Sequence, residues 1–149
     1  MNYFNDQEKN ILAEASSVVV GFSGGADSSL ALYVTNDYLK EIDASSKLLA
    51  LHVNHMAQDD SSIWEKHCED VCTASGIKFE VHQKQVDVKG EGFEAAARKV
   101  RQEIFASFGA NTVIVLGHHL DDQVETVLFR MLRGTGMKGL SGKIGRAHV

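Results

Sequence analysis

Proline is absent from this sequence, and cysteine occurs only at positions 68 and 72. Two cysteines cannot form the disulfide framework of a small secreted domain, so we interpret them as free thiols in a reducing compartment. Fifteen lysines and arginines against 20 aspartates and glutamates give a net charge of −5, which excludes a basic nucleic-acid-binding surface over the whole chain but not a local basic patch. The longest apolar run, 113–117, is far shorter than the ~20 residues of a membrane helix, and the polar first ten residues carry no secretory signal. These absences predict a cytoplasmic protein without a membrane partner.

The composition is that of a globular protein, with 44% hydrophobic and 23% charged residues over 149 positions. A chain of this length buries a core without metal or disulfide support. We expect one domain over residues 1–143. Residues 144–149 carry no strand or helix pattern, and we interpret them as an artefactual tail.

Short apolar segments alternate with amphipathic ones along the chain. The apolar segments predict strands at 17–22, 47–54, 77–82 and 111–117. Apolar residues three or four positions apart predict helices at 27–41, 60–75, 92–108 and 121–133, with Gly76 as the left-handed end of the second. This order predicts an α/β fold with a doubly wound parallel sheet. Ligands of such sheets bind beyond the carboxyl ends of the strands, where the turns 23–28 and 118–122 are expected.

A glycine-rich turn follows the first predicted strand and consists of Ser23, Gly24, Gly25, Ala26, Asp27 and Ser28. Both glycines can adopt positive φ, so that successive amides converge on one anion, and the next helix adds free N–H groups. The hydroxyls of Ser23 and Ser28 can donate to phosphate, and Asp27 can hold Mg²⁺ beside it. A plain strand–helix turn with Asp27 or Ser28 as the N-cap is the alternative. The lysine of the Walker loop is absent, which excludes that motif.

Three carboxylates, those of Asp121, Asp122 and Glu125, follow His119 at the start of the fourth predicted helix. On a helix, Asp121 and Glu125 share a face. A helix N-terminus needs one acidic cap, so the surplus indicates a bound cation, either Mg²⁺ held by Asp121 with Asp27 or a cationic substrate.

Two family resemblances rest on these motifs. Ser-Gly-Gly-x-Asp-Ser after a first strand resembles the pyrophosphate loop of the ATP-pyrophosphatase family, whose members split ATP between the α and β phosphates and adenylate a substrate. The His-x-Asp-Asp-Gln-x-Glu-Thr stretch from His119 and the Arg-Gly-Thr-Gly stretch from Arg133 are similar to the tRNA(Ile)-lysidine synthetase family. That resemblance extends over roughly 18–142. Residues 56–58 depart from the family's Gly-Leu-Arg.

The resemblance implies an adenine-nucleotide alpha-hydrolase-like (Rossmann-like) fold and a ligase that uses ATP and Mg²⁺. The implied reaction joins L-lysine to cytidine-34 of tRNA(Ile) through an adenylated tRNA. The family's Glu-Ala-x-Ala-Arg helix matches 94–98, which implies that Arg98 contacts ATP. ATP would also contact the turn 23–28, the strand end at Val53, His119 and Arg133.

The catalytic residues implied are Asp27, Asp121, Asp122 and Glu125, whose carboxylates would bind the lysine ammonium and remove a proton. Members of the family carry further domains that bind tRNA, so we expect this C-terminally truncated chain to bind tRNA weakly and to be inactive alone. Two alternatives stay open. One is another adenylating enzyme of the same superfamily, such as a tRNA thiolase, and the other is a non-enzymatic ATP-binding module.

Overall fold

A computed structural model describes residues 3–54, 61–83, 92, 99, 103–105, 107–109, 111–120, 123–130 and 143–148, with the backbone course alone for those from 118 onward. The elements in chain order are α1 (Asp6–Glu14), β1 (Ser17–Gly21), α2 (Ala26–Glu41), a 3₁₀ turn (Ser45–Lys47), β2 (Leu48–Asn54), α3 (Ser61–Ser75), β3 (Lys78–Gln83), β4 (Thr112–Leu120), β5 (Gln123–Arg130) and β6 (Lys143–His148). Among these residues, no helix is long and apolar enough to cross a membrane.

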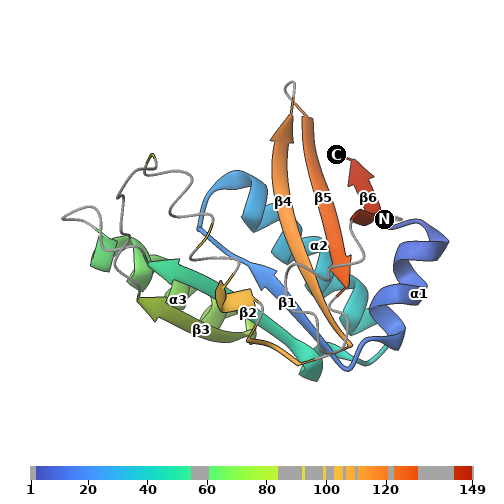
Figure 1. The fold of residues 1–149 in the computed structure, drawn as a ribbon. Helices are drawn as coiled ribbons and strands as arrows, with labels where there is room; N and C mark the ends of the chain where they lie inside the picture. Colours follow the sequence, from blue (N-terminus) through green and yellow to red (C-terminus); the bar gives the residue numbers. More distant parts are fainter. Residues whose placement is uncertain are drawn as a thin grey trace.

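The described strands form one mixed sheet in the order β3-β2-β1-β4-β5-β6 (Figure 1). The first four strands in this order pair in parallel, which confirms the predicted α/β fold with its parallel sheet. The chain proceeds from β1 outward to β2 and β3, and then returns to the other side of β1 as β4. The carboxyl ends of β1 and β4 therefore form the switch point at which ligands of such sheets bind.

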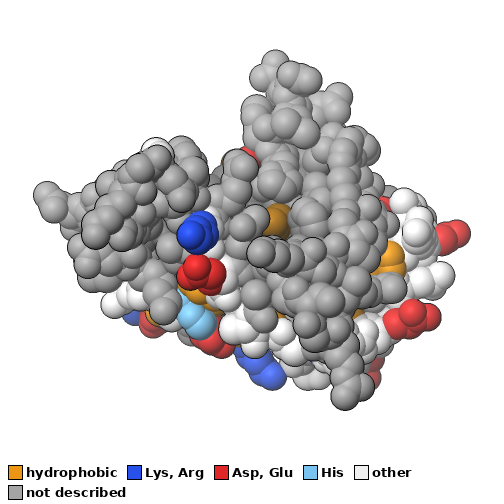
Figure 2. All heavy atoms as spheres, in the orientation of Figure 1, with side chains coloured by type: hydrophobic (Ala, Val, Ile, Leu, Met, Phe, Trp, Pro, Cys, Tyr) orange, Lys and Arg blue, Asp and Glu red, His pale blue; other side chains and the backbone are white. Residues whose placement is uncertain are grey.

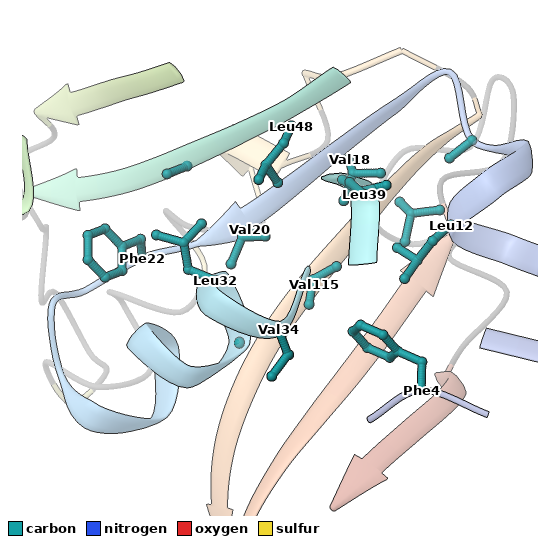
Figure 3. Packing of buried hydrophobic residues seen from close by; sticks show 14 of the residues in the cluster. Phe4, Leu12, Val18, Val20, Phe22, Leu32, Val34, Leu39, Leu48 and Val115 are labelled. Carbon is teal, nitrogen blue, oxygen red and sulfur yellow. The ribbon is translucent and has the colours of Figure 1, made fainter. Parts of the chain in front are cut away.

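Alternate residues of β1 face two separate hydrophobic clusters on the two sides of the sheet. Val18 and Val20 pack in the larger cluster with side chains of α1, α2 and α3, part of which Figure 3 shows. Val19 packs in the smaller cluster with Ile104 and Phe105. Because a strand points successive side chains to opposite faces, apolar layers cover both faces of the sheet, as a doubly wound fold requires.

The third predicted helix is described only in part. Lys99 and residues 103–105 are helical, and most of 92–108 lies outside the described residues. The end of α3 agrees with the prediction, since Gly76 follows it with a φ of +70°.

The N-terminal helix α1 was not predicted from its apolar pattern. Its first turn is fixed by a capping box, in which the Asn5 side chain accepts from the Glu8 amide and the Glu8 carboxylate accepts from the Asn5 amide, each at 2.8 Å. Ile11 and Leu12 are buried in the larger cluster. The Asn-x-x-Glu spacing is the sequence signal that predicts this helix start.

The predicted fourth helix at 121–133 is wrong. The described residues of that segment form β5, which pairs antiparallel with a β4 that extends to Leu120, and β6 pairs antiparallel with β5 (Figure 1). Val124, Val127 and Leu128 have helical spacing, but the segment is also rich in β-branched residues, and pairing along β4 satisfies its backbone. The strand β6 spans residues in which we predicted no element.

Candidate functional site

The glycine-rich turn connects the carboxyl end of β1 to α2, at the switch point of the sheet. It is anchored at its start by the Phe22 amide, which donates to the Leu51 carbonyl of β2 at 2.8 Å. The structure therefore places the turn where the sequence predicted it.

Gly24 is the position in this turn that requires glycine. Its φ is +88°, and a Cβ placed there would lie 2.9 Å from the Cys68 sulfur and 3.1 Å from the Trp64 ring. The prediction of positive φ at both glycines is corrected at Gly25. That residue is the N-cap of α2, with an ordinary φ of −75°, and a Cβ there would meet only Ser23 Oγ, at 3.5 Å.

Two serine side chains stabilise the turn from within. The Ser23 amide donates to Ser28 Oγ at 3.0 Å, and the two hydroxyl oxygens are also 3.0 Å apart. The Gly25 amide donates to Ser23 Oγ at 3.3 Å, and the Ser28 hydroxyl donates to the Gly25 carbonyl at 3.4 Å. Ser28 is buried, so its hydroxyl shapes the turn, while the exposed Ser23 lies at the surface.

The first turn of α2 supplies backbone donors next to Gly24. The first backbone bond of the helix runs from the Ser29 amide to the Gly25 carbonyl at 2.9 Å. The amides of Ala26 and Asp27 precede this bond, so the helix offers them no acceptor, and the positive end of the helix dipole adds to them. This arrangement is typical of an anion site.

The start of α2 packs directly on β4 at Gly117. A Cβ at Gly117 would lie 2.3 Å from the Asp27 carbonyl oxygen and 3.2 Å from the Ser28 amide nitrogen. Such backbone-to-backbone contact is possible only for glycine. It brings the strand that leads to His119 against the turn that contains Asp27.

Near the end of β2, His52 has a structural role. Its ring is buried, and Nδ1 donates to the Phe22 carbonyl at 2.9 Å. Val53 is half-buried and packs against the smaller cluster. These contacts hold the second strand against the start of the turn, and the contact of Val53 with ATP stays a prediction.

Beyond β2, a polar cluster connects three elements. The Glu65 carboxylate of α3 accepts from Asn54 of β2 and from Gln83 of β3, each at 3.1 Å. Hydrogen bonds from Gln83 and then Asn54 lower the pKa of Glu65. The cluster fixes α3 to the carboxyl edge of the sheet.

Several predicted site residues have no described side chain. Arg98, Asp121, Asp122 and Arg133 lie outside the described residues, and His119 and Glu125 are described by their backbone alone. Their roles stay predictions.

The predicted sharing of a helix face by Asp121 and Glu125 is corrected. Glu125 belongs to β5, where its Cα is the register partner of His118 in β4. Since Thr126 is in turn the partner of Gly117, this part of β5 lies one strand away from the contact with Asp27.

The two thiols are buried in the larger cluster. Desolvation raises the pKa of both Cys68 and Cys72 to about 11. Cysteines with raised pKa values are poor nucleophiles and metal ligands. Within the described part of the chain, no group of histidine, cysteine and acidic residues is placed to hold a metal ion.

A separate hollow of about 170 Å³ lies between the N-terminal segment and the outer face of α2, lined in part by Tyr33, Asp37 and Glu41. Asp37 and Glu41 add negative charge to its wall, which disfavours a phosphate there.

Sequence reasoning missed two residues that shape the turn. Gly117 was grouped with its strand, although a glycine in a buried strand is itself a signal of close backbone approach. Trp64 falls within the helix predicted at 60–75, yet its ring lies against Gly24 and its indole N–H donates to the Ser23 carbonyl at 2.5 Å. No periodicity in the sequence indicates that contact.

Comparison with protein families gives a match to the PP-loop domain over residues 2–148. The chain belongs to the PP-loop domain family, and this match implies the use of ATP.

Among curated proteins, the chain is 39% identical over 129 residues to a tRNA(Ile)-lysidine synthase of Francisella philomiragia, covering 85% of this chain and 31% of that protein. It is 40% identical over 141 residues to that of Pseudomonas syringae pv. tomato, covering 91% and 31%. The corresponding protein of Legionella pneumophila strain Paris is 41% identical over 131 residues, covering 87% and 30%. The chain thus spans about a third of the length of these relatives.

Proposed function

We propose that this domain binds ATP through its phosphates at the turn 23–28 and serves as the nucleotide-binding part of a tRNA(Ile)-lysidine synthase. The observation that carries the proposal is the turn itself. In a chain of the PP-loop family, Gly24 is held at a φ of +88° at the switch point, beside the amides that open α2. Amide donors at a helix start are the groups that stabilise a pyrophosphate leaving group.

Mg²⁺ fits the proposed site because carboxylate oxygens are its preferred protein ligands. Asp27 stands in the first turn of α2, next to the proposed phosphate position. We propose Asp27 and Asp121 as its ligands, and Val53, Arg98, His119 and Arg133 as further contacts to ATP. When bound, the ion supplies positive charge against the phosphates.

The reaction we propose has two steps, of which the first adenylates the cytidine at O2 and releases pyrophosphate. In the second step the ε-amine of lysine attacks C2 and AMP leaves. Free lysine has a pKa of about 10.4, so its amine arrives protonated. The carboxylates of Asp121, Asp122 and Glu125 provide the counter-charge for this ammonium and a base for its proton.

We expect this domain alone to bind tRNA weakly. Its net charge is −5. On the face in Figure 2, the described acidic and basic side chains are interspersed, and the coloured part of that face shows no broad basic field. Because phosphate contacts dominate nucleic-acid affinity, tRNA binding is expected to need the rest of a full-length protein.

The test is a chimera in which residues 1–142 of this chain replace the matching part of the Pseudomonas syringae relative. Pyrophosphate release and incorporation of labelled lysine into tRNA(Ile) are measured separately, with the unmodified relative as the control. We expect both activities in the chimera. Pyrophosphate release without lysine transfer would favour another adenylating enzyme, and nucleotide binding without either activity would favour a binding module.

Variants of the chimera test the role of each acidic residue in the two steps. Asp121→Asn, Asp122→Asn and Glu125→Gln each remove one charge with little change in shape. We expect at least one of them to adenylate tRNA and fail to add lysine, because a neutral amide neither holds an ammonium nor accepts its proton. Wild-type lysine transfer in all three would contradict the proposed role of these carboxylates.

A further inference from the structure

Trp64, the single tryptophan of the chain, lies against the turn. Its side chain is 47% exposed, yet its indole N–H donates to the Ser23 carbonyl at 2.5 Å. A Cβ built at Gly24 would lie 3.1 Å from the Trp64 ring, so the ring leaves no room for a side chain at that position. A large aromatic residue left half in solvent is thus fixed by the turn rather than by the core.

Neighbouring side chains hold the tryptophan and the turn in this arrangement. His67, one turn further along α3, stacks on the indole with ring centroids 5.2 Å apart and planes 25° apart. The buried Cys68 supports Gly24 from the same helix. The preceding carbonyl, that of Phe22, accepts from His52 at 2.9 Å. Two successive carbonyls, those of Phe22 and Ser23, are therefore held by side chains of other elements.

Holding a carbonyl also sets the direction of an amide. In a planar trans peptide, the C=O of one residue and the N–H of the next point in opposite directions. The indole fixes the Ser23 carbonyl toward α3, so the Gly24 N–H points away from α3. The Phe22–Ser23 peptide follows the same rule, and its N–H is bound within the turn to Ser28 Oγ at 3.0 Å.

We propose that Trp64 is a positioning residue for nucleotide binding, which aims the Gly24 amide at the phosphate by holding the Ser23 carbonyl. This inference rests on the proposed binding of ATP at the turn. The proposal gives α3 a part in phosphate recognition that needs no direct contact between α3 and the nucleotide.

The test compares the full chain with Trp64→Phe, which keeps an aromatic ring and removes the N–H donor. Affinities for ATP with Mg²⁺, inorganic pyrophosphate and adenosine are measured by calorimetry. Ile63→Ala is the matched control, since Ile63 is the adjacent residue of α3 and is 72% exposed. We expect Trp64→Phe to weaken ATP and pyrophosphate by about two- to tenfold, the range of one lost hydrogen bond. Adenosine binding should be unchanged.

The emission of Trp64 supplies a second measurement that needs no variant. Because the indole lies at the turn, pyrophosphate should shift or quench the fluorescence of the wild-type chain, and adenosine should do so less. Equal affinities in Trp64→Phe and wild type, or an equal loss for adenosine, would overturn the positioning role while ATP binding stands. Failure of the wild type to bind either ATP or pyrophosphate would overturn the proposed function instead.

Discussion

Gly117→Ala tests whether the contact between β4 and α2 sets the geometry of the phosphate site. The added Cβ would lie 2.3 Å from the Asp27 carbonyl oxygen, 2.7 Å from its carbon and 3.2 Å from the Ser28 nitrogen. All three are backbone atoms, so no side chain can rotate out of the way. To restore ordinary contact, the start of α2 or the strand must move by about 1 Å.

The expected cost follows from that displacement. Overpacking of a close-packed interior lowers the free energy of unfolding by about 1–3 kcal/mol. For a chain of this size, each kcal/mol lowers the melting temperature by about 2–4 °C. Since the atoms displaced belong to Asp27 and Ser28, the amides proposed to hold phosphate move with them, and we expect ATP affinity to fall by about tenfold or more.

The assays are thermal unfolding and calorimetric titration with ATP and Mg²⁺. Gly109→Ala is the control, because a Cβ at Gly109 would have no neighbour within 4 Å. It should leave both quantities close to the wild type. If Gly117→Ala matches the wild type in melting temperature and in ATP affinity, the contact does not position the turn and this reasoning is refuted.

Three further predictions concern stability. Because burial raises the pKa of Cys68 and Cys72 from 9.0 to about 11, the unfolded chain loses these protons first, and denaturant titrations should show the free energy of unfolding falling between about pH 9 and 11. The double variant Cys68→Ala/Cys72→Ala is the matched control and should show a smaller fall; an equal fall would contradict the prediction. Glu65→Ala removes two accepted hydrogen bonds and should lower the free energy of unfolding by about 1 kcal/mol near neutral pH. Because these bonds also lower the pKa of Glu65, the loss should shrink as the pH falls below 4.5, whereas the exposed Glu69→Ala should cost little; an equal loss at both pH values would contradict this prediction. Asn5→Ala should lower the free energy of unfolding by about 1 kcal/mol through loss of the α1 cap, and an unchanged denaturation curve would count against that cap.

Where the residue pattern of a segment and its neighbouring segments indicate the same element, the sequence is sufficient to predict the structure. The strand predicted at 17–22 and the helix at 27–41 correspond to β1 (Ser17–Gly21) and α2 (Ala26–Glu41), because β-branched runs and helical spacing leave little choice there. The turn between them carries its own signal in its glycines. Its place in the sheet then follows from the order of the elements.

The sequence does not predict an element whose type is decided by pairing with a strand elsewhere in the sheet. The residues 123–130 have both helical spacing and β-branched side chains, and the register against Val113–Leu120 that selects the strand is a tertiary property. The same limit applies within the site. Gly24, the glycine of the turn with positive φ, lies beside Trp64 and Cys68, side chains some 40 positions along the chain that no local rule connects to the turn.

Titration of ATP with Mg²⁺ into Gly24→Ala and Gly25→Ala tests most directly whether the turn binds the phosphates. The two variants add the same methyl group to adjacent residues. At Gly24 the methyl would lie 2.9 Å from the Cys68 sulfur, and the backbone has a φ of +88°. At Gly25 the methyl would meet only the Ser23 hydroxyl, at 3.5 Å. A left-handed conformation costs an alanine about 1–2 kcal/mol before any clash, so we predict at least a tenfold loss of affinity in Gly24→Ala and a loss of at most about threefold in Gly25→Ala. Wild-type affinity in a folded Gly24→Ala would contradict the account.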